Sequence, residues 1–463
     1  MSNEESSLVD LSAEDAERQF PGKSEFVHLH NHTIFSLLDG VAKPIDYFKG
    51  CVDRKWPAFA ITEHGVLSSI PDAYLSAKEC GVKYLVGCEF YFCDYNDRRK
   101  KMQEQKIKLS DVRKDQPELA SRLLRNRHLT VIAKNEEGYK TLLALNLGAY
   151  QDNFYYKPRI SLEQLARNKK NIIVLSGCLN GPICHELRAG NISGNDEFIG
   201  AIEYVKIFQK MFGDDFYIEL QMPGVEGEKE VFEQLVVIAN HFKIKMIVAN
   251  DCHYIQREDF TMQKVMMAID QQLPVDSPDL FHVNSNEQYF KTRHELRASF
   301  KLRGFDKFAT DDDFERACDN TLEIAEKCKV FKPDLGPKLP SLGDAESELR
   351  RLAEEGLRTK GLDKDETRFM IDNREVSYKE QMEIELERFI EKGFASYFLI
   401  TRDLVMQSKS KGWPLGPARG SAGGSLVCYL LDIHELNPRK WKLSFNRFLS
   451  PSRGGKMLKI TME

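Results

Sequence analysis

The stretch that decides the fold is Phe26-Val-His-Leu-His-Asn-His-Thr33, a short β-type run that ends in histidines. Residues i and i+2 of a strand point to the same face, so the imidazoles of His30 and His32 can reach one ion. Further short apolar, β-branched runs follow in the first 260 residues, namely Ala58–Thr62, Tyr84–Phe92, His128–Ala133, Ile172–Ser176, Phe216–Leu220 and Lys245–Asn250. A strand pattern of this regularity predicts a sheet that runs through the first half of the chain.

Helix-compatible segments separate most of these runs, for example Pro44–Lys55, Ile70–Cys80 and Glu228–His241. Apolar runs without alternation are typical of strands buried on both faces, as in a parallel sheet. Seven βα-like units over about 250 residues predict an α/β fold, specifically a distorted seven-stranded β/α barrel of the TIM type. The chemistry of such a barrel gathers at the C-terminal ends of its strands. A doubly wound open sheet is the alternative.

The pattern changes after Tyr254. Helical sequence is expected over Phe260–Ile269 and Asp312–Cys328, and a Pro/Gly-containing segment at 332–340 then breaks the chain. We therefore expect three parts: a flexible N-terminus (1–24), the barrel (25–268), and a second region (269–463) that begins with a helical connector.

Composition narrows the function classes. The 463 residues are 42% hydrophobic and 30% charged with a net charge of −5, an ordinary globular balance. Apolar stretches fall far short of the roughly 20 residues that cross a bilayer, so no membrane association is expected. The acidic, polar N-terminus has no signal-peptide pattern, and ten cysteines without framework spacing suggest reduced thiols in a cytoplasm. Two basic runs, Arg98–Arg127 and Arg439–Lys459, are either solvated surfaces or phosphate-tracking patches.

Several of the predicted strands end in, or open with, a residue that can bind a metal. The candidates besides His30 and His32 are Asp39, His64, Glu89, His128, Cys178, Asp251 and His253. Mixed imidazole, carboxylate and thiolate ligands suit zinc, manganese or iron. Nine ligands exceed one tetrahedral ion, so we expect two or three divalent ions with a bridging carboxylate, an arrangement that cuts phosphate esters. A structural metal site is the alternative.

The motifs containing these residues resemble those of the PHP (polymerase and histidinol phosphatase) family. They are Phe26–Thr33, Ser36–Gly40, Ile61–Gly65, Val86–Glu89, Leu175–Cys178 and Asn250–Tyr254, and their order is most similar to the PHP domain of the bacterial C-family replicative DNA polymerases. The resemblance implies that all nine candidates are metal ligands and that the site is a 3′–5′ exonuclease. Asp39, Asp251 and His253 are the expected catalytic residues. His28 and Glu63 are expected to stand behind the ligands and orient them.

A glycine-rich loop, Leu415–Ser425, precedes an apolar helix-like run. Its small residues let backbone amides approach an anion, and Arg419, Gly420 and Ser421 are the candidate phosphate-binding or nucleotide-binding residues. The loop resembles the palm loop of the same polymerases, although Ala418 replaces the usual Gly. This implies that 269–463 contains a partial α+β nucleotidyltransferase palm.

The sequence departs from the polymerase pattern in one respect. The family's Asp-x-Asp pair, which binds two magnesium ions, does not follow the palm loop here, and neither do the thumb and fingers. Polymerisation is therefore expected to need a complementary chain carrying those residues, with DNA and other replisome proteins as partners. Alternatives are a stand-alone phosphoesterase of the histidinol-phosphatase type and a non-catalytic replication scaffold.

Overall fold

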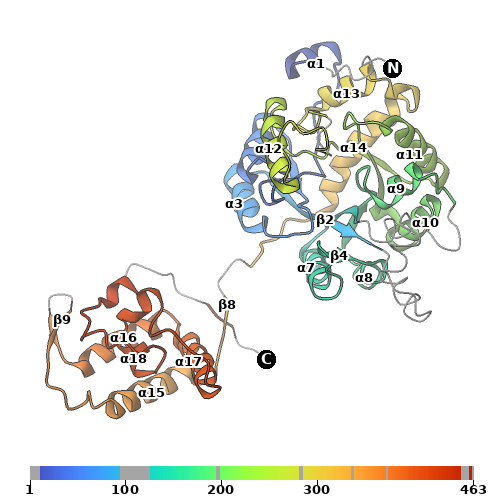
Figure 1. Ribbon diagram of the computed structural model, residues 1–463. Helices are drawn as coiled ribbons and strands as arrows, with labels where there is room; N and C mark the ends of the chain where they lie inside the picture. The colour runs from blue at the N-terminus through green and yellow to red at the C-terminus, as the bar shows by residue number, and fades with distance from the viewer. Residues whose placement is uncertain are drawn as a thin grey trace, which may run out of the picture. The chain divides into compact units, whose positions relative to one another are not determined.

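The chain folds into two units, Met1–Pro333 and Asp334–Glu463 (Figure 1). Each unit is described by itself. The computed structural model describes residues 11–93, 126–193, 199–280, 285–334, 338–371, 374–449 and 458–460. Within these residues, no helix is long and apolar enough to cross a membrane.

The first unit is built on one twisted sheet with the strand order β1-β2-β3-β5-β6-β7, to which β4 adds beside β2. The strands are β1 (Ala58–Ile61), β2 (Lys83–Phe92), β3 (Arg127–Ala133), β4 (Arg159–Ile160), β5 (Ile172–Leu175), β6 (Phe216–Leu220) and β7 (Met246–Val248). Six of these correspond to the apolar runs that the sequence predicts. The α/β class is thereby confirmed.

The seventh predicted run, residues 26–32, forms a seam between the two edge strands of this sheet. On the β1 side, Ala60 N donates to His28 O (3.0 Å) and Thr62 N to Asn31 O (2.9 Å). On the side of the segment after β7, Cys252 N donates to His30 O (3.2 Å) and His32 N to Cys252 O (2.7 Å). The seam turns the sheet into a distorted barrel, as predicted, rather than an open doubly wound sheet.

Strand β3 runs against its neighbours. It pairs antiparallel with both β2 and β5, whereas β1/β2, β5/β6 and β6/β7 are parallel. The expectation of a parallel sheet is therefore wrong for this strand, because a run buried on both faces reads the same in either direction. The reversal brings the start of β3 to the rim where the parallel strands end.

The helices of the first unit are α1 (Ala13–Gln19), α2 (Pro44–Asp53), α3 (Ile70–Cys80), α7 (Glu136–Gln151), α8 (Leu162–Arg167), α9 (Pro182–Arg188), α10 (Ala201–Phe212), α11 (Glu228–Phe242), α12 (Phe260–Gln271), α13 (Arg293–Leu302) and α14 (Asp311–Lys327). Most pack on the outer face of the barrel in one large core cluster. A smaller cluster joins inward residues such as Ala58, Ala60 and Leu85 to Ile324 and Ala325 of α14. Helix α14 therefore packs against the interior layer of the barrel.

Local signals set the bounds of α14. Thr310 accepts the Asp313 amide in a capping box, three aspartates occupy the first turn, and Lys327 lies in the last. Phe290, Leu296, Phe300 and Phe314 join the barrel's core cluster. Residues 269–333, expected to belong with the second region, thus pack in the first unit.

The second unit is mainly helical. Its elements are β8 (Lys338–Pro340), α15 (Ala345–Thr359), β9 (Phe369–Ile371), β10 (Arg374–Val376), α16 (Tyr378–Glu391), α17 (Ala395–Ser410), α18 (Leu426–Leu430) and β11 (Leu458–Ile460). The strands form two short pairs, β9 with β10 and β8 with β11. The core contains Leu349, Met382, Leu386, Phe389 and Leu426, which are fully buried. The assignment of this unit to a polymerase palm stays a prediction.

Candidate metal centre

One rim of the barrel gathers all nine metal-binding candidates, and each contacts at least one other. Their sources are the seam for His30 and His32, the loop after it for Asp39, the segments after β1, β5 and β7 for His64, Cys178, Asp251 and His253, and the strands β2 and β3 for Glu89 and His128. His128 reaches this rim from the start of its strand because β3 is reversed. The rim is therefore the product of one closed sheet with one inverted strand.

Glu89 lies at the centre of one half of the cluster. Its carboxylate is within 3.1 Å of His30 Nε2, 2.5 Å of His64 Nδ1 and 3.0 Å of His128 Nδ1. Cys178 Sγ lies 3.7 Å from Glu89 Oε1 and 3.6 Å from His128 Nδ1. A carboxylate contacted by three imidazoles and a thiol has the surroundings of a bridging ligand.

Asp251 and Asp39 organise the other half. Asp251 Oδ1 lies 3.2 Å from His32 Nε2 and 3.4 Å from His30 Nε2. Asp39 Oδ2 lies 2.8 Å from His64 Nε2 and 3.3 Å from His253 Nε2. The two halves share His30 and His64, so the cluster is continuous.

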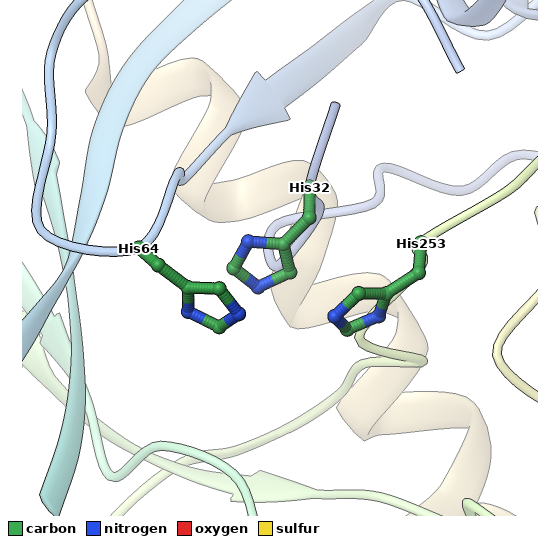
Figure 2. Close-up of side chains that lie close together, drawn as sticks. All are labelled: His32, His64 and His253. Atoms are coloured by element: carbon green, nitrogen blue, oxygen red, sulfur yellow. The ribbon is translucent and has the colours of Figure 1, made fainter. Parts of the chain in front are cut away.

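Three of the imidazoles converge from separate segments, as Figure 2 shows. The ring of His32 stacks between the other two, with centroids 3.9 Å from His64 and 4.5 Å from His253. Stacking three basic rings in a buried site is unfavourable if they are protonated. Burial, with His64 and His253 as neighbours, lowers the pKa of His32 to about 3, so this imidazole is neutral at physiological pH.

The donor atoms have the properties of a site built for cations. Among the described residues, five buried atoms of the cluster have no hydrogen-bond partner: His30 Nε2, His32 Nε2, His64 Nδ1, Glu89 Oε2 and Asp251 Oδ1. Buried polar atoms are normally paired, so a convergent unpaired group indicates a missing ligand. Three overlapping triads each place their donor atoms within 4.8 Å of one another: His32/His64/His253, His30/His32/Asp251 and His64/Glu89/His128. The residues present therefore fit two or three divalent ions.

The carboxylates are in the protonation state that metal binding requires. Burial opposes their ionisation, but His128, His64 and His30 hold the pKa of Glu89 well below its usual range. His253 and His64 do the same for the pKa of Asp39, against the same effect of burial. Burial raises the pKa of the Cys178 thiol, so that ligand would have to lose its proton to a bound cation.

Glu63 supports His32 indirectly, in the place expected of it. The Glu63 carboxylate accepts hydrogen bonds from Ser36 Oγ (2.5 Å) and Thr33 Oγ1 (2.5 Å), and Ser36 Oγ lies 2.9 Å from His32 Nδ1. His28 is placed differently. Its ring packs against Trp56 and Phe290, and its nitrogens contact Lys291 O (2.8 Å) and Cys252 Sγ (3.4 Å).

Glu219 was missed by the sequence reasoning. Its buried carboxylate accepts from His30 Nδ1 at 2.7 Å and from Gln221 Nε2 at 2.6 Å. A carboxylate can only accept, so the proton sits on His30 Nδ1 and the Nε2 lone pair faces the cluster. A single acid inside the apolar run Phe216–Leu220 was the signal that could have revealed it, since a buried charge in a strand needs a partner.

The backbone is strained at two positions beside the ligands. Asp251 has φ of 48° and Leu38, next to Asp39, has φ of 62°. Non-glycine residues seldom adopt the left-handed region, and such strain concentrates at functional sites.

A cleft of about 1150 Å³ opens over the cluster. It is lined by the ligand candidates Asp39, His64, His128, Cys178, Asp251 and His253. Its walls also carry Lys157 and Arg188, two cationic side chains that suit an anionic substrate. The metal-binding candidates are therefore accessible to a molecule larger than water.

The second predicted site, the glycine-rich loop, is exposed at Arg419, Gly420 and Ser421. The helix that follows is not open to an anion, because the buried carboxylate of Glu385 already accepts from the amides of Leu426 and Val427, both at 3.0 Å. The expected contribution of this helix N-terminus to phosphate binding is therefore absent in this arrangement, and phosphate binding by the loop stays a prediction.

The basic runs are only partly described. Most of Arg98–Arg127 lies outside the described residues, as does 450–457 of the second run. Arg439 belongs to that second run, but its guanidinium donates to Gln381 and lies over the ring of Phe369, 4.8 Å from its centroid. At least this cation is part of the fold of the second unit.

Comparison with known proteins gives matches to both units. Residues 28–223 match the family model of the PHP domain, and residues 347–457 match that of the bacterial DNA polymerase III alpha NTPase domain. The DNA polymerase III alpha subunits of Borreliella burgdorferi and Aquifex aeolicus are both 34% identical over 93% of this chain. The chain covers 34% and 35% of those proteins, about a third of their length.

A solved two-domain protein of Bacteroides vulgatus that contains a predicted PHP-like metal-dependent phosphoesterase is 12% identical, with a TM-score of 0.30 over 60% of this chain and 69% of that chain. A superposition this loose adds nothing to the assignment. The sequence relatives, in contrast, align through both units in one continuous order. The chain therefore belongs to the bacterial DNA polymerase III alpha-subunit family, with a PHP domain in its first unit and part of the NTPase domain in its second.

Proposed function

We propose that the PHP domain hydrolyses phosphodiesters at the 3′ end of DNA, using two or three divalent ions held by the nine rim residues. The observation that carries this proposal is the convergence of unpaired donor atoms on the rim, at the base of an accessible cleft. Zinc, manganese or iron fit the mixture of imidazole, carboxylate and thiolate donors better than magnesium alone. Clustered ions, when bound, lower the pKa of water and neutralise charge on a phosphate.

The residues have distinct tasks in this proposal. Glu89, at the meeting point of three imidazoles, bridges ions. His253 donates from Nδ1 to Asp251 O (2.7 Å), which leaves the Nε2 lone pair facing Asp39 and the cleft. Asp39, Asp251 and His253 all line the cleft, so they are placed to orient the scissile phosphate and to accept a proton from the attacking water.

The second unit is proposed to be the start of a nucleotidyltransferase palm, whose Arg419, Gly420 and Ser421 bind a phosphate. Two-metal nucleotidyl transfer requires clustered carboxylates, which this sequence does not contain after the glycine-rich loop. Polymerisation would thus depend on magnesium and on acidic residues supplied by a complementary chain, with DNA and replisome proteins as partners. Adding that segment to this chain should give DNA synthesis, and its failure to do so would contradict the palm proposal.

The decisive experiment compares bound metal and hydrolysis in the wild type, Asp251→Asn and Asp270→Asn. The first variant is nearly isosteric, and Asn tolerates the left-handed backbone of this position. Asp270 is exposed and lines the same cleft, which makes it a matched control. We expect Asp251→Asn to lose bound metal and at least 100-fold of its activity on a 3′-labelled single strand, whereas Asp270→Asn keeps both.

Three results would contradict the proposal. Equal activity of the two variants would remove Asp251 from the site. Hydrolysis of small phosphomonoesters but not of DNA would indicate a phosphatase of the histidinol-phosphatase type. A wild type that binds no metal and hydrolyses nothing would indicate a scaffold.

A further inference from the structure

One wall of the metal cleft carries exposed aromatic side chains that the proposed hydrolysis does not use. Tyr150, Phe154 and Tyr156 all line the cleft and are 46%, 56% and 81% exposed. Single exposed apolar residues are ordinary, but three large aromatic rings within seven positions, all on the wall of one cleft, indicate a binding surface. These three residues are called the aromatic platform below.

The platform has a defined arrangement. Tyr150, in the last turn of α7, stacks on Phe154 with ring centroids 6.0 Å apart and an angle of 29°. The ring of Tyr155 meets that of Tyr156 edge-on, at 4.7 Å and 82°, and is itself covered by the guanidinium of Arg159 at 5.0 Å. The exposed ring of Tyr156 is thus supported from behind, and its face is open.

Tyr156 also has an unusual backbone. Its φ is 58°, in the left-handed region that bulky residues rarely adopt. The turn is closed by a hydrogen bond from Tyr155 N to Lys157 O (3.1 Å). The strained turn does not serve to bury the Tyr156 ring, which is 81% exposed, so it presents a large aromatic group to the cleft.

The platform is connected to the metal centre. Asn146 of α7 donates to the carbonyl of Gly65 (2.8 Å), directly after the ligand candidate His64. The ammonium group of Lys157 lies over the Tyr91 ring, 5.7 Å from its centroid, and Tyr91 stacks with His64 at 6.1 Å. A path of aromatic rings with a cation beside it therefore runs from the platform to the metal ligands.

We propose that the aromatic platform stacks the bases of a single DNA strand whose terminal phosphodiester lies at the metal centre. This inference rests on the proposed hydrolysis and names its substrate as single-stranded rather than duplex DNA. Every base offers a π face to an aromatic ring, but in a duplex those faces are covered by neighbouring base pairs. Lys157 and Arg188 face the phosphates, and Asp270 is the acidic side chain on the same walls outside the ligand set.

The test measures binding without hydrolysis. The full 463-residue chain, stripped of metal with a chelator, is titrated with an oligothymidylate and with an abasic strand of equal length, both followed by fluorescence anisotropy. The wild type is expected to bind the thymidylate about tenfold more tightly, because stacking is lost with the bases. The double variant Phe154→Ala/Tyr156→Ala should remove that preference and leave the affinity for the abasic strand unchanged.

Two control variants separate stacking from general damage. Leu147→Ala changes a 57% exposed side chain on α7 that does not line the cleft, and it should keep the preference. Tyr156→Phe retains the ring and should also keep it. Equal binding of both strands by the wild type, or an undiminished preference in the double variant, would overturn the platform.

The platform and the hydrolysis can fail separately. A metal-loaded chain that prefers thymidylate but cleaves nothing retains the platform and contradicts the proposed nuclease. A chain that cleaves thymidylate and abasic strands at the same rate keeps the nuclease and contradicts the platform. Binding of blunt duplex as tightly as of the single strand would contradict the platform as well.

Discussion

The two units each bury a glutamate beneath a polar surface, and the two glutamates have opposite surroundings. In the first unit, Glu89 is 1% exposed, three imidazoles lie close to it, and its Oε2 has no hydrogen-bond partner among the described residues. In the second, Glu385 is fully buried and accepts from Ser425 Oγ (2.7 Å), Leu426 N (3.0 Å), Val427 N (3.0 Å) and Gln381 Nε2 (2.7 Å).

The comparison teaches how to separate a buried functional group from a buried structural one. Glu385 has donors for both oxygens from its own chain, so it fastens α16 to the start of α18 and needs no ligand. The donor atoms around Glu89 converge without satisfying one another, so they require a cation. The predictions below test this contrast, from the largest expected effect to the smallest.

Metal loading should affect only the first unit. At a free ion concentration about 1000 times the dissociation constant, a bound ion stabilises the folded state by about 4 kcal/mol. We expect zinc or manganese to raise the unfolding temperature of the first unit and a chelator to reverse the change, measured by calorimetry of the full chain. A shift of both units, or of neither, would break the contrast.

Removing the carboxylate of Glu385 should affect only the second unit. Glu385→Ala leaves the amides of Leu426 and Val427 and the Ser425 hydroxyl buried without an acceptor, at a cost of about 3 kcal/mol. Glu385→Gln, which keeps one acceptor oxygen, should cost less. Urea unfolding monitors both variants, and their metal content should equal that of the wild type. Loss of metal from either variant would show that Glu385 is not purely structural.

Glu219→Gln sharpens the description of the first unit. The amide no longer fixes the proton on His30 Nδ1, and support of this kind changes metal affinity by about 10- to 100-fold. Competition with a chelator of known affinity measures the change. Glu233→Gln, at an exposed position of α11, is the matched control and should bind metal normally. Equal affinities would mean that Glu219 does not orient His30.

A pH difference of smaller size is expected in the second unit from His434. Burial lowers the pKa of His434 below the 6.5 of a free histidine, although Ser425 O lies 3.1 Å from its Nε2. The unfolded state therefore binds the proton more readily, so stability is complete above pH 6.5 and falls as the pH falls through that value. The slope is below about 1.4 kcal/mol per pH unit. Urea unfolding at pH 7 and pH 5.5 should show a smaller difference in His434→Asn.

The fold could be predicted largely because apolar runs and their terminal residues are local features. Six runs became strands, and the seventh became the seam that closes the barrel. Strand direction could not be predicted: nothing in Arg127–Ala133 distinguishes a parallel from an antiparallel buried strand. The place of residues 269–333 was also missed, since their apolar faces show that they pack but not on what.

The candidate site was predictable where its residues recur at strand ends. His64, Cys178 and Asp251 each stand three residues after the last residue of their strand, in β1, β5 and β7. Glu219 lies within a strand and acts through His30, and Glu385 meets the amide of Leu426 across 41 positions, so neither has a local signature. Tyr150, Phe154 and Tyr156 follow no period, and only the folded cleft shows them together. Metal ligation by the nine residues stays a prediction until metal is measured.

The seam has a consequence for how this family can change. Residues 28–32 hold both edges of the sheet through their backbone while their side chains supply His30 and His32. Deleting the segment would unzip the barrel along with the loss of its ligands. A descendant that gives up metal binding must therefore do so by exchanging side chains one at a time, so the scaffold should outlive its chemistry.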